Sequence, residues 1–176
     1  MIPTSVDGGG TVRRVTSTAT TGRRYRSWSL RSITQLFSAA AEPLLDQLVG
    51  THHATALGPW WVRRPAPLLL AATGMPGWWG KEFAPPSPSE PTTLAGHNLR
   101  ESDGRVVPSL AMTARLGRSR VDSRPAVVLT YEPGAPWPWR GVTDEVRPLP
   151  DGLLLGLSFD IVAKVPIAAP FLLERR

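Results

Sequence analysis

Residues 142–159 read Val-Thr-Asp-Glu-Val-Arg-Pro-Leu-Pro-Asp-Gly-Leu-Leu-Leu-Gly-Leu-Ser-Phe. Two strand-like runs, 142–149 and 153–159, flank the sequence Pro150-Asp-Gly152. Proline followed by Asp-Gly between apolar runs is a strong turn signal. This stretch therefore predicts a β-hairpin.

The segments around this hairpin also show a period of two, which is typical of strands. Residues 110–116 alternate Leu, Met, Ala and Leu with smaller or polar residues, and residues 127–131 alternate Val, Leu and Tyr with Val and Thr. Residues 51–57 and 171–175 add a short early strand and a final strand. Short strands at this spacing, after one or two helices, predict a mainly β (α+β) fold: a calycin-like antiparallel β-barrel or strongly bent sheet.

Residues 33–48 carry apolar side chains at helical spacing and end at Gly50. They predict a helix that Pro43 either kinks or restarts. Residues 65–73 predict a second, brief helix, and the aromatic segment 76–83 is expected to form a turn. Residues 85–91 contain four prolines and predict a stiff surface loop.

Residues 1–29 are rich in Ser, Thr, Gly and Arg and predict a disordered basic tail ahead of a single domain, 30–176. Residues 1–31 hold six arginines and one aspartate, a charge of +5, so only +1 of the total of +6 belongs to residues 32–176. We therefore expect no nucleic-acid partner for the domain.

The chain has no cysteine, which excludes disulfides and thiol chemistry. Its longest apolar stretch, 65–79, is interrupted by proline and glycine, so we expect no membrane insertion and a cytoplasmic location. The neighbours His52 and His53 would point to opposite faces of a strand, and His97 stands alone. We therefore expect no metal and no cofactor.

Six of the seven tryptophans form three tight clusters beside proline or glycine. Aromatic residues at such bends bury ring area at the rim of a core or cavity, so they indicate an apolar pocket. We expect the ligand of this pocket to contact Trp61, Trp78, Trp79, Phe83, Met112, Trp137, Trp139 and Arg140.

Asp144 shares one face of its predicted strand with Val142 and Val146, whereas Glu145 and Arg147 lie on the other face. A carboxylate pointing inward needs a cation or several donors. It is either a structural group bonded to turn amides or an indole, or a general base or ligand anchor.

Lys81 is one of only two lysines beside 18 arginines. It could pair with Asp144, meet a ligand, or contact Glu82 or an indole at the surface, and Arg140 beside Trp139 has the same alternatives. Tyr131 has the inward phase, so it is either a core residue or a group that orients a substrate oxygen. The predicted catalytic set is Asp144, Lys81 and Tyr131.

Two regions resemble a known family. Leu44-Leu45-x-x-Leu48-Val-Gly50 followed by Trp78-Trp-Gly-Lys-Glu-Phe83 resembles the GXWXG-type domain. The region from Arg124 to Tyr131, Asp144-Glu-Val-Arg147, Leu155-Gly156 and Phe171-Leu-Leu-Glu-Arg175 resembles the uncharacterised domain that usually follows it. The segment that names the family is Gly50-Thr-His-His-Ala54 here, without its Trp or second Gly. The resemblance implies a compact, mostly β fold with a pocket, and it adds weight to Lys81, Asp144 and Arg147.

The leading hypothesis is a barrel that encloses a small lipophilic metabolite and acts on it as a cofactor-independent isomerase or cyclase of secondary metabolism. The main alternative is a non-catalytic carrier or sensor that uses the same pocket. A third class, a partner-binding module, would use the loop Trp137-Pro-Trp139 as an interface. A homodimer is possible in each case.

Overall fold

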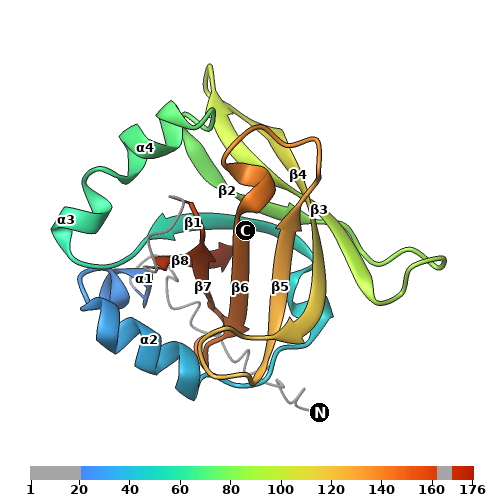
Figure 1. Cartoon of the computed structure of the whole chain (residues 1–176), viewed down its shortest axis with the longest axis horizontal. Helices are drawn as coiled ribbons and strands as arrows, with labels where there is room; N and C mark the ends of the chain where they lie inside the picture. Colours follow the sequence, from blue (N-terminus) through green and yellow to red (C-terminus); the bar gives the residue numbers. More distant parts are fainter. Residues whose placement is uncertain (1–20, 162–167) are drawn as a thin grey trace, which may run out of the picture.

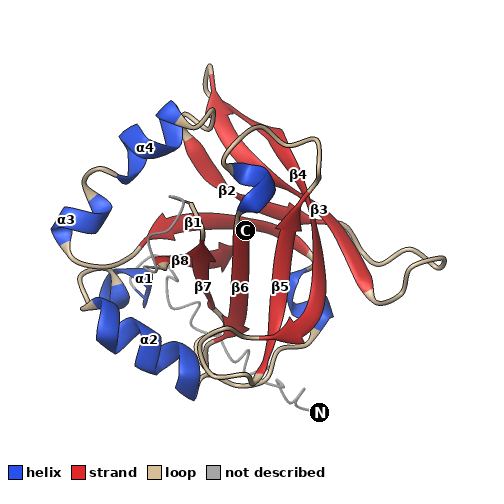
Figure 2. Cartoon of the chain, viewed as in Figure 1, coloured by secondary structure: helices blue, strands red, loops and turns tan. Residues whose placement is uncertain are grey.

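The computed structural model describes residues 21–161 and 168–176. Within them, eight strands form a closed antiparallel barrel in which each strand pairs with its neighbours in sequence and β8 pairs back to β1 (Figures 1 and 2). The predicted antiparallel barrel is thereby confirmed. The strands are β1 (Gly50–Ala56), β2 (Trp78–Phe83), β3 (Thr93–Ser102), β4 (Arg105–Arg118), β5 (Pro125–Tyr131), β6 (Thr143–Pro148), β7 (Leu154–Phe159) and β8 (Ala169–Arg175).

Short helices surround the barrel, and the α-helices gather on the left of the view in Figure 1. A continuous helix over 33–48 is not formed. It ends at Ala39 because the following segment is extended, and a single 3-10 turn precedes β1. The helices are α1 (Thr21–Tyr25), α2 (Leu30–Ala39), η2 (Leu45–Leu48), α3 (Trp60–Arg63), α4 (Ala66–Ala72) and η3 (Trp139–Gly141).

Apolar side chains fill two separate cores. One lies inside the barrel and includes Phe83, Leu129, Val146 and Phe171. The other lies between the barrel wall and the helices α1 and α2, where Phe37 packs with leucines of β7. Burial therefore extends to both faces of β6 and β7. The sequence of β7 is accordingly almost entirely apolar, whereas β6 buries the charged residues Asp144, Glu145 and Arg147.

Two further predictions need correction, and one strand was missed. The segment 76–83 is not a turn, because Trp78–Phe83 is strand β2. Strand β3 was not predicted at all. The folded part begins before residue 30, since α1 is helical and Tyr25 is buried in the second core, where its hydroxyl donates to Asp151 at 3.0 Å. Residues 1–20 of the predicted tail lie outside the described residues.

Candidate functional site

A β-bulge in β2 determines which tryptophan enters the barrel. The pairing of β2 with β3 shifts between Trp78 and Gly80, so that Trp78 and Lys81 both contact the interior. Strict alternation from Lys81 would have turned Trp79 inward instead. Gly80 makes the shift possible, because a Cβ there would lie 1.9 Å from the carbonyl oxygen of His52.

Inside the barrel, four strands bring together a buried polar network. Lys81 Nζ of β2 lies 2.8 Å from Asp144 Oδ2 of β6. It also donates to Asn98 Oδ1 of β3 at 2.8 Å and to the hydroxyl of Tyr131 of β5 at 3.1 Å. All four side chains are at least nine-tenths buried. The ion pair of Lys81 and Asp144 is therefore shielded from water. A buried ion pair is stable only when its remaining donors and acceptors are also hydrogen-bonded.

The remaining hydrogen bonds orient each group of the network. The indole Nε1 of Trp78 donates to Asn98 Oδ1 at 3.1 Å, and Asn98 Nδ2 donates to the Tyr131 hydroxyl at 2.9 Å. That hydroxyl in turn donates to Asp144 Oδ2 at 3.2 Å. Since the indole and the ammonium group only donate, the amide oxygen of Asn98 must face them.

One atom of this network lacks a partner. Among the described residues, Asp144 Oδ1 is buried and accepts no hydrogen bond. The three N–H groups of Lys81 match its three oxygen partners. Within the described part of the chain, the one unsatisfied group of the network is therefore a carboxylate oxygen. A buried acceptor without a donor destabilises the folded state.

The electrostatic setting keeps the hydroxyl of Tyr131 protonated. Burial and the neighbouring Asp144 carboxylate raise the pKa of Tyr131 well above its ordinary value of 10.0. The ammonium group of Lys81 also lies 5.5 to 5.8 Å from the ring centres of Tyr131, Phe171 and Trp78. These ring faces attract a cation and so add to the contact between Lys81 and Asp144.

An apolar cavity of about 150 Å³ adjoins the network. Lys81, Asn98, Tyr131 and Asp144 form part of its wall, together with Trp78. Residues of helices α3 and α4 form another part of its wall: Val62, Ala66, Leu69 and Leu70. A cavity of this size holds a molecule as large as benzene.

The structure brings together all three predicted catalytic residues and two of the predicted ligand contacts, Trp78 and Trp139. Trp139 Nε1 donates to the carbonyl of Thr73 at 2.6 Å, which ties η3 to the end of α4. The prediction that Asp144 points inward with Val142 and Val146 is confirmed, since all three side chains belong to the interior of the barrel.

The other predicted contacts lie away from this cavity. Phe83 and Met112 are core residues that do not line it, and Trp79 packs edge-to-face on His53 at 5.0 Å outside the barrel. Trp61, Trp137 and Arg140 are exposed. A use of Trp137 as a protein interface and a homodimer stay predictions.

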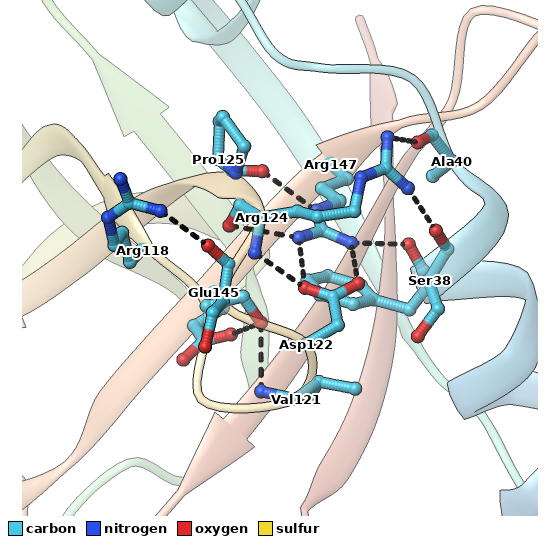
Figure 3. A network of polar contacts seen from close by, with 12 residues as sticks. Ser38, Ala40, Arg118, Val121, Asp122, Arg124, Pro125, Glu145 and Arg147 are labelled. Carbon is cyan, nitrogen blue, oxygen red and sulfur yellow. Dashed lines mark hydrogen bonds and ion pairs between the residues drawn. The ribbon is translucent and has the colours of Figure 1, made fainter.

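Arg147 does not belong to the site, although the family resemblance gave it weight. Its side chain is on the outer face of β6 and fully buried under α2 and the segment 119–124. It forms two hydrogen bonds of 2.7 Å with Asp122 and also donates to the backbone carbonyls of Phe37, Arg124 and Pro125 (Figure 3). Arg147 thus holds a helix and a loop to the barrel wall.

Sequence reasoning missed Asn98 and Phe171 as cavity residues. Asn98 lies in the strand that was not predicted, and Phe171 packs over Gly156, where a Cβ would lie 2.1 Å from its ring. The sequence Leu155-Gly156 did indicate this contact, since a glycine within an apolar strand often marks a place where another group packs close to the backbone.

No group of three metal-ligating side chains occurs within residues 21–161 and 168–176. In the same part of the chain, no helix has the length and hydropathy to cross a bilayer.

The chain thus forms an eight-stranded antiparallel barrel with an interior ion pair beside a small cavity, an architecture compatible with ligand binding. A similar solved structure is "Crystal structure of protein from Thermomonospora curvata", with a TM-score of 0.62 and 17% sequence identity. The match covers 90% of this chain and 95% of that chain, and it shows the fold alone. No protein-family model and no curated protein matches the chain, so the GXWXG resemblance stays a prediction.

Proposed function

We propose that the barrel binds a small lipophilic molecule that presents a hydrogen-bond donor or an acidic C–H group to Asp144. The observation that carries this proposal is the unpartnered Oδ1 of a buried carboxylate that lines an apolar cavity. A ligand donor would complete the hydrogen bonding there, and the apolar walls would select a ligand with a hydrocarbon body.

Proton transfer is the chemistry that this arrangement favours. Asp144 Oδ1 would remove a proton from one carbon of the substrate and return it to another, which is a cofactor-independent isomerisation or the start of a cyclisation. Lys81 and Tyr131 both donate to Oδ2, so they would hold the carboxylate in place and leave Oδ1 as the reacting atom. The cavity would supply orientation and exclude water.

A non-catalytic carrier or sensor is the second candidate, and the contact between Lys81 and Asp144 favours it. Lys81 Nζ, 2.8 Å from Asp144 Oδ2, already forms the ion pair that a buried, ligand-anchoring carboxylate requires. In that case Asp144 would anchor the ligand without accepting its proton.

Binding can be tested with phenol and toluene, two probes of similar size of which only phenol carries a donor. Calorimetry should show phenol binding about tenfold more tightly than toluene, because only phenol can bond Asp144 Oδ1. The double variant Lys81→Met/Asp144→Leu should lose this preference. Ala66→Phe, which fills the cavity from α4, should abolish binding of both probes.

The binding proposal fails if neither probe binds the folded protein, or if the preference for phenol survives in the double variant. Catalysis is tested separately, by the exchange of α-hydrogens of cyclohexanone for deuterium in D₂O. If the protein is an enzyme, the exchange rate should fall about 100-fold in Asp144→Asn. If it is a carrier, the wild type and Asp144→Asn should both give the exchange rate of buffer alone.

A further inference from the structure

A second, larger depression of about 520 Å³ lies beside the cavity, between β1 and the helices α3 and α4. Its wall combines residues of β1 and α3 with Arg26, which follows α1. Three arginines, Arg26, Arg63 and Arg64, line it together with the exposed indole of Trp60. We call this depression the arginine groove.

The charge of the arginine groove is unbalanced. No Asp or Glu is among the described residues that line it. Within the same described residues, none of its three guanidinium groups forms an ion pair, and only Arg63 Nε is bonded, to the carbonyl of Gly58 at 2.8 Å. That bond fixes the Arg63 side chain and leaves its two terminal nitrogens for an anion.

The arginine groove adjoins the cavity. Ala56, Ala66, Leu70 and Trp78 line both spaces. A molecule that reached between these residues would place its apolar end in the cavity and its other end among the arginines. At this boundary two of the shared residues are alanines, whereas Leu70 and Trp78 are bulky.

We infer that the ligand is an amphipathic anion, whose carboxylate or phosphate group binds Arg26, Arg63 and Arg64 while its apolar end enters the cavity beside Asp144. This inference rests on the proposed function, because it assigns the other end of the same ligand. Guanidinium groups recognise both kinds of oxyanion through paired N–H donors. The exposed Trp60 offers an apolar surface to the hydrocarbon portion near the mouth.

The test compares 3-phenylpropionate and 2-phenylethyl phosphate with the neutral 3-phenylpropan-1-ol, and phenol serves as the probe of the cavity alone. The anion that the arginine groove prefers should bind about tenfold more tightly than the alcohol at low salt, and added salt should reduce this advantage. The carboxylate and phosphate arms identify the anion. The triple variant Arg26→Gln/Arg63→Gln/Arg64→Gln should bind the anions about tenfold more weakly and phenol unchanged within about twofold.

Arg105→Gln, at an exposed arginine of β4 outside the arginine groove, is the matched control and should leave all affinities unchanged. The inference is overturned if the alcohol binds as tightly as both anions, or if the triple variant keeps the affinity for anions. If the inference fails but the wild-type protein still binds phenol, the proposed function stands. If the wild-type protein does not bind phenol, the proposed function itself is overturned.

Discussion

Two ion pairs on opposite faces of β6 differ in how completely they are bonded. On the inner face, Asp144 pairs with Lys81 beside the cavity and keeps one oxygen without a partner among the described residues. On the outer face, Arg147 pairs with both oxygens of Asp122 and also bonds three backbone carbonyls. The inner pair is buried and adjoins the cavity, whereas 18% of the Asp122 side chain of the outer pair is exposed.

Glu145, also on the outer face of β6, has a hydrogen-bond partner for each of its carboxylate oxygens. Its Oε2 accepts from Ser119 Oγ at 2.5 Å and its Oε1 accepts from the backbone N–H of Arg120 at 2.8 Å. Arg124 reaches across to the carbonyls of Ser38 and Ala40 at the end of α2 (Figure 3). Arg147, Asp122 and Glu145 are fully bonded between three segments and form a structural clasp, whereas the incompletely bonded pair beside the cavity is the feature on which the proposed binding site rests.

Replacing the outer pair with apolar residues should have the largest effect. In Arg147→Met/Asp122→Leu, the carbonyls of Phe37, Arg124 and Pro125 lose their donor, so we expect the free energy of unfolding to fall by about 4 kcal/mol. Urea denaturation measures it. The control Arg140→Met, at an exposed arginine, should change it by less than about 0.5 kcal/mol. A loss below about 1 kcal/mol for the double variant would contradict the structural role of the clasp.

The inner pair should behave differently under the same treatment. Lys81→Met alone leaves the Asp144 carboxylate buried without its cation and should cost about 3 kcal/mol. Adding Asp144→Leu removes that charge, and the double variant should return to within about 1.5 kcal/mol of the wild type. The free energies of unfolding of both variants, measured by urea denaturation, test this expectation. If the double variant is as unstable as Lys81→Met, the inner pair is also structural.

Acid should weaken the clasp through Asp122. Hydrogen bonds from Arg147 lower the pKa of Asp122 from 3.8 to about 2, so its contribution is complete above the higher value and is lost as pH falls through the lower one. The contribution is about 2 kcal/mol. Asp122→Asn should therefore be less stable than the wild type by this amount near pH 5, and the difference should close near pH 2. A difference that is constant over this range would contradict the assignment.

The smallest expected losses of stability are those of the tyrosine variants Tyr131→Phe and Tyr25→Phe. Tyr131→Phe removes a hydroxyl that accepts from Lys81 and Asn98 and donates to Asp144, so it should cost about 1.5 kcal/mol. Tyr25→Phe removes one bond to the exposed Asp151 and should cost about 0.5 kcal/mol. Thermal unfolding compares the two. Equal losses would mean that the interior network adds nothing beyond an ordinary surface bond.

The sequence predicted the inner site better than the outer clasp, for a physical reason. Alternation within one strand places Asp144 with Val142 and Val146, and a scarce lysine is a natural partner for it. The bulge that selects Trp78 over Trp79 shifts the chain by one residue, which a pattern of period two cannot reveal. Asn98 was missed because Gly96 and polar residues obscure the alternation of β3.

The clasp depends on tertiary contacts that local patterns do not contain. Asp122 meets Arg147 only because the segment after β4 folds back beneath the end of α2. The pattern did place Glu145 and Arg147 opposite Asp144, but it gave no reason to expect a cover over that face. Exposed tryptophans such as Trp61 and Trp137 share the turn context of Trp139, so sequence alone could not separate them.

A crystal structure of the protein soaked with phenol tests the central claim most directly. We expect the ring in the cavity under α3 and α4, with the hydroxyl oxygen about 2.7 Å from Asp144 Oδ1. Phenol bound elsewhere, or bound in the cavity with its hydroxyl turned away from that oxygen, would contradict the account.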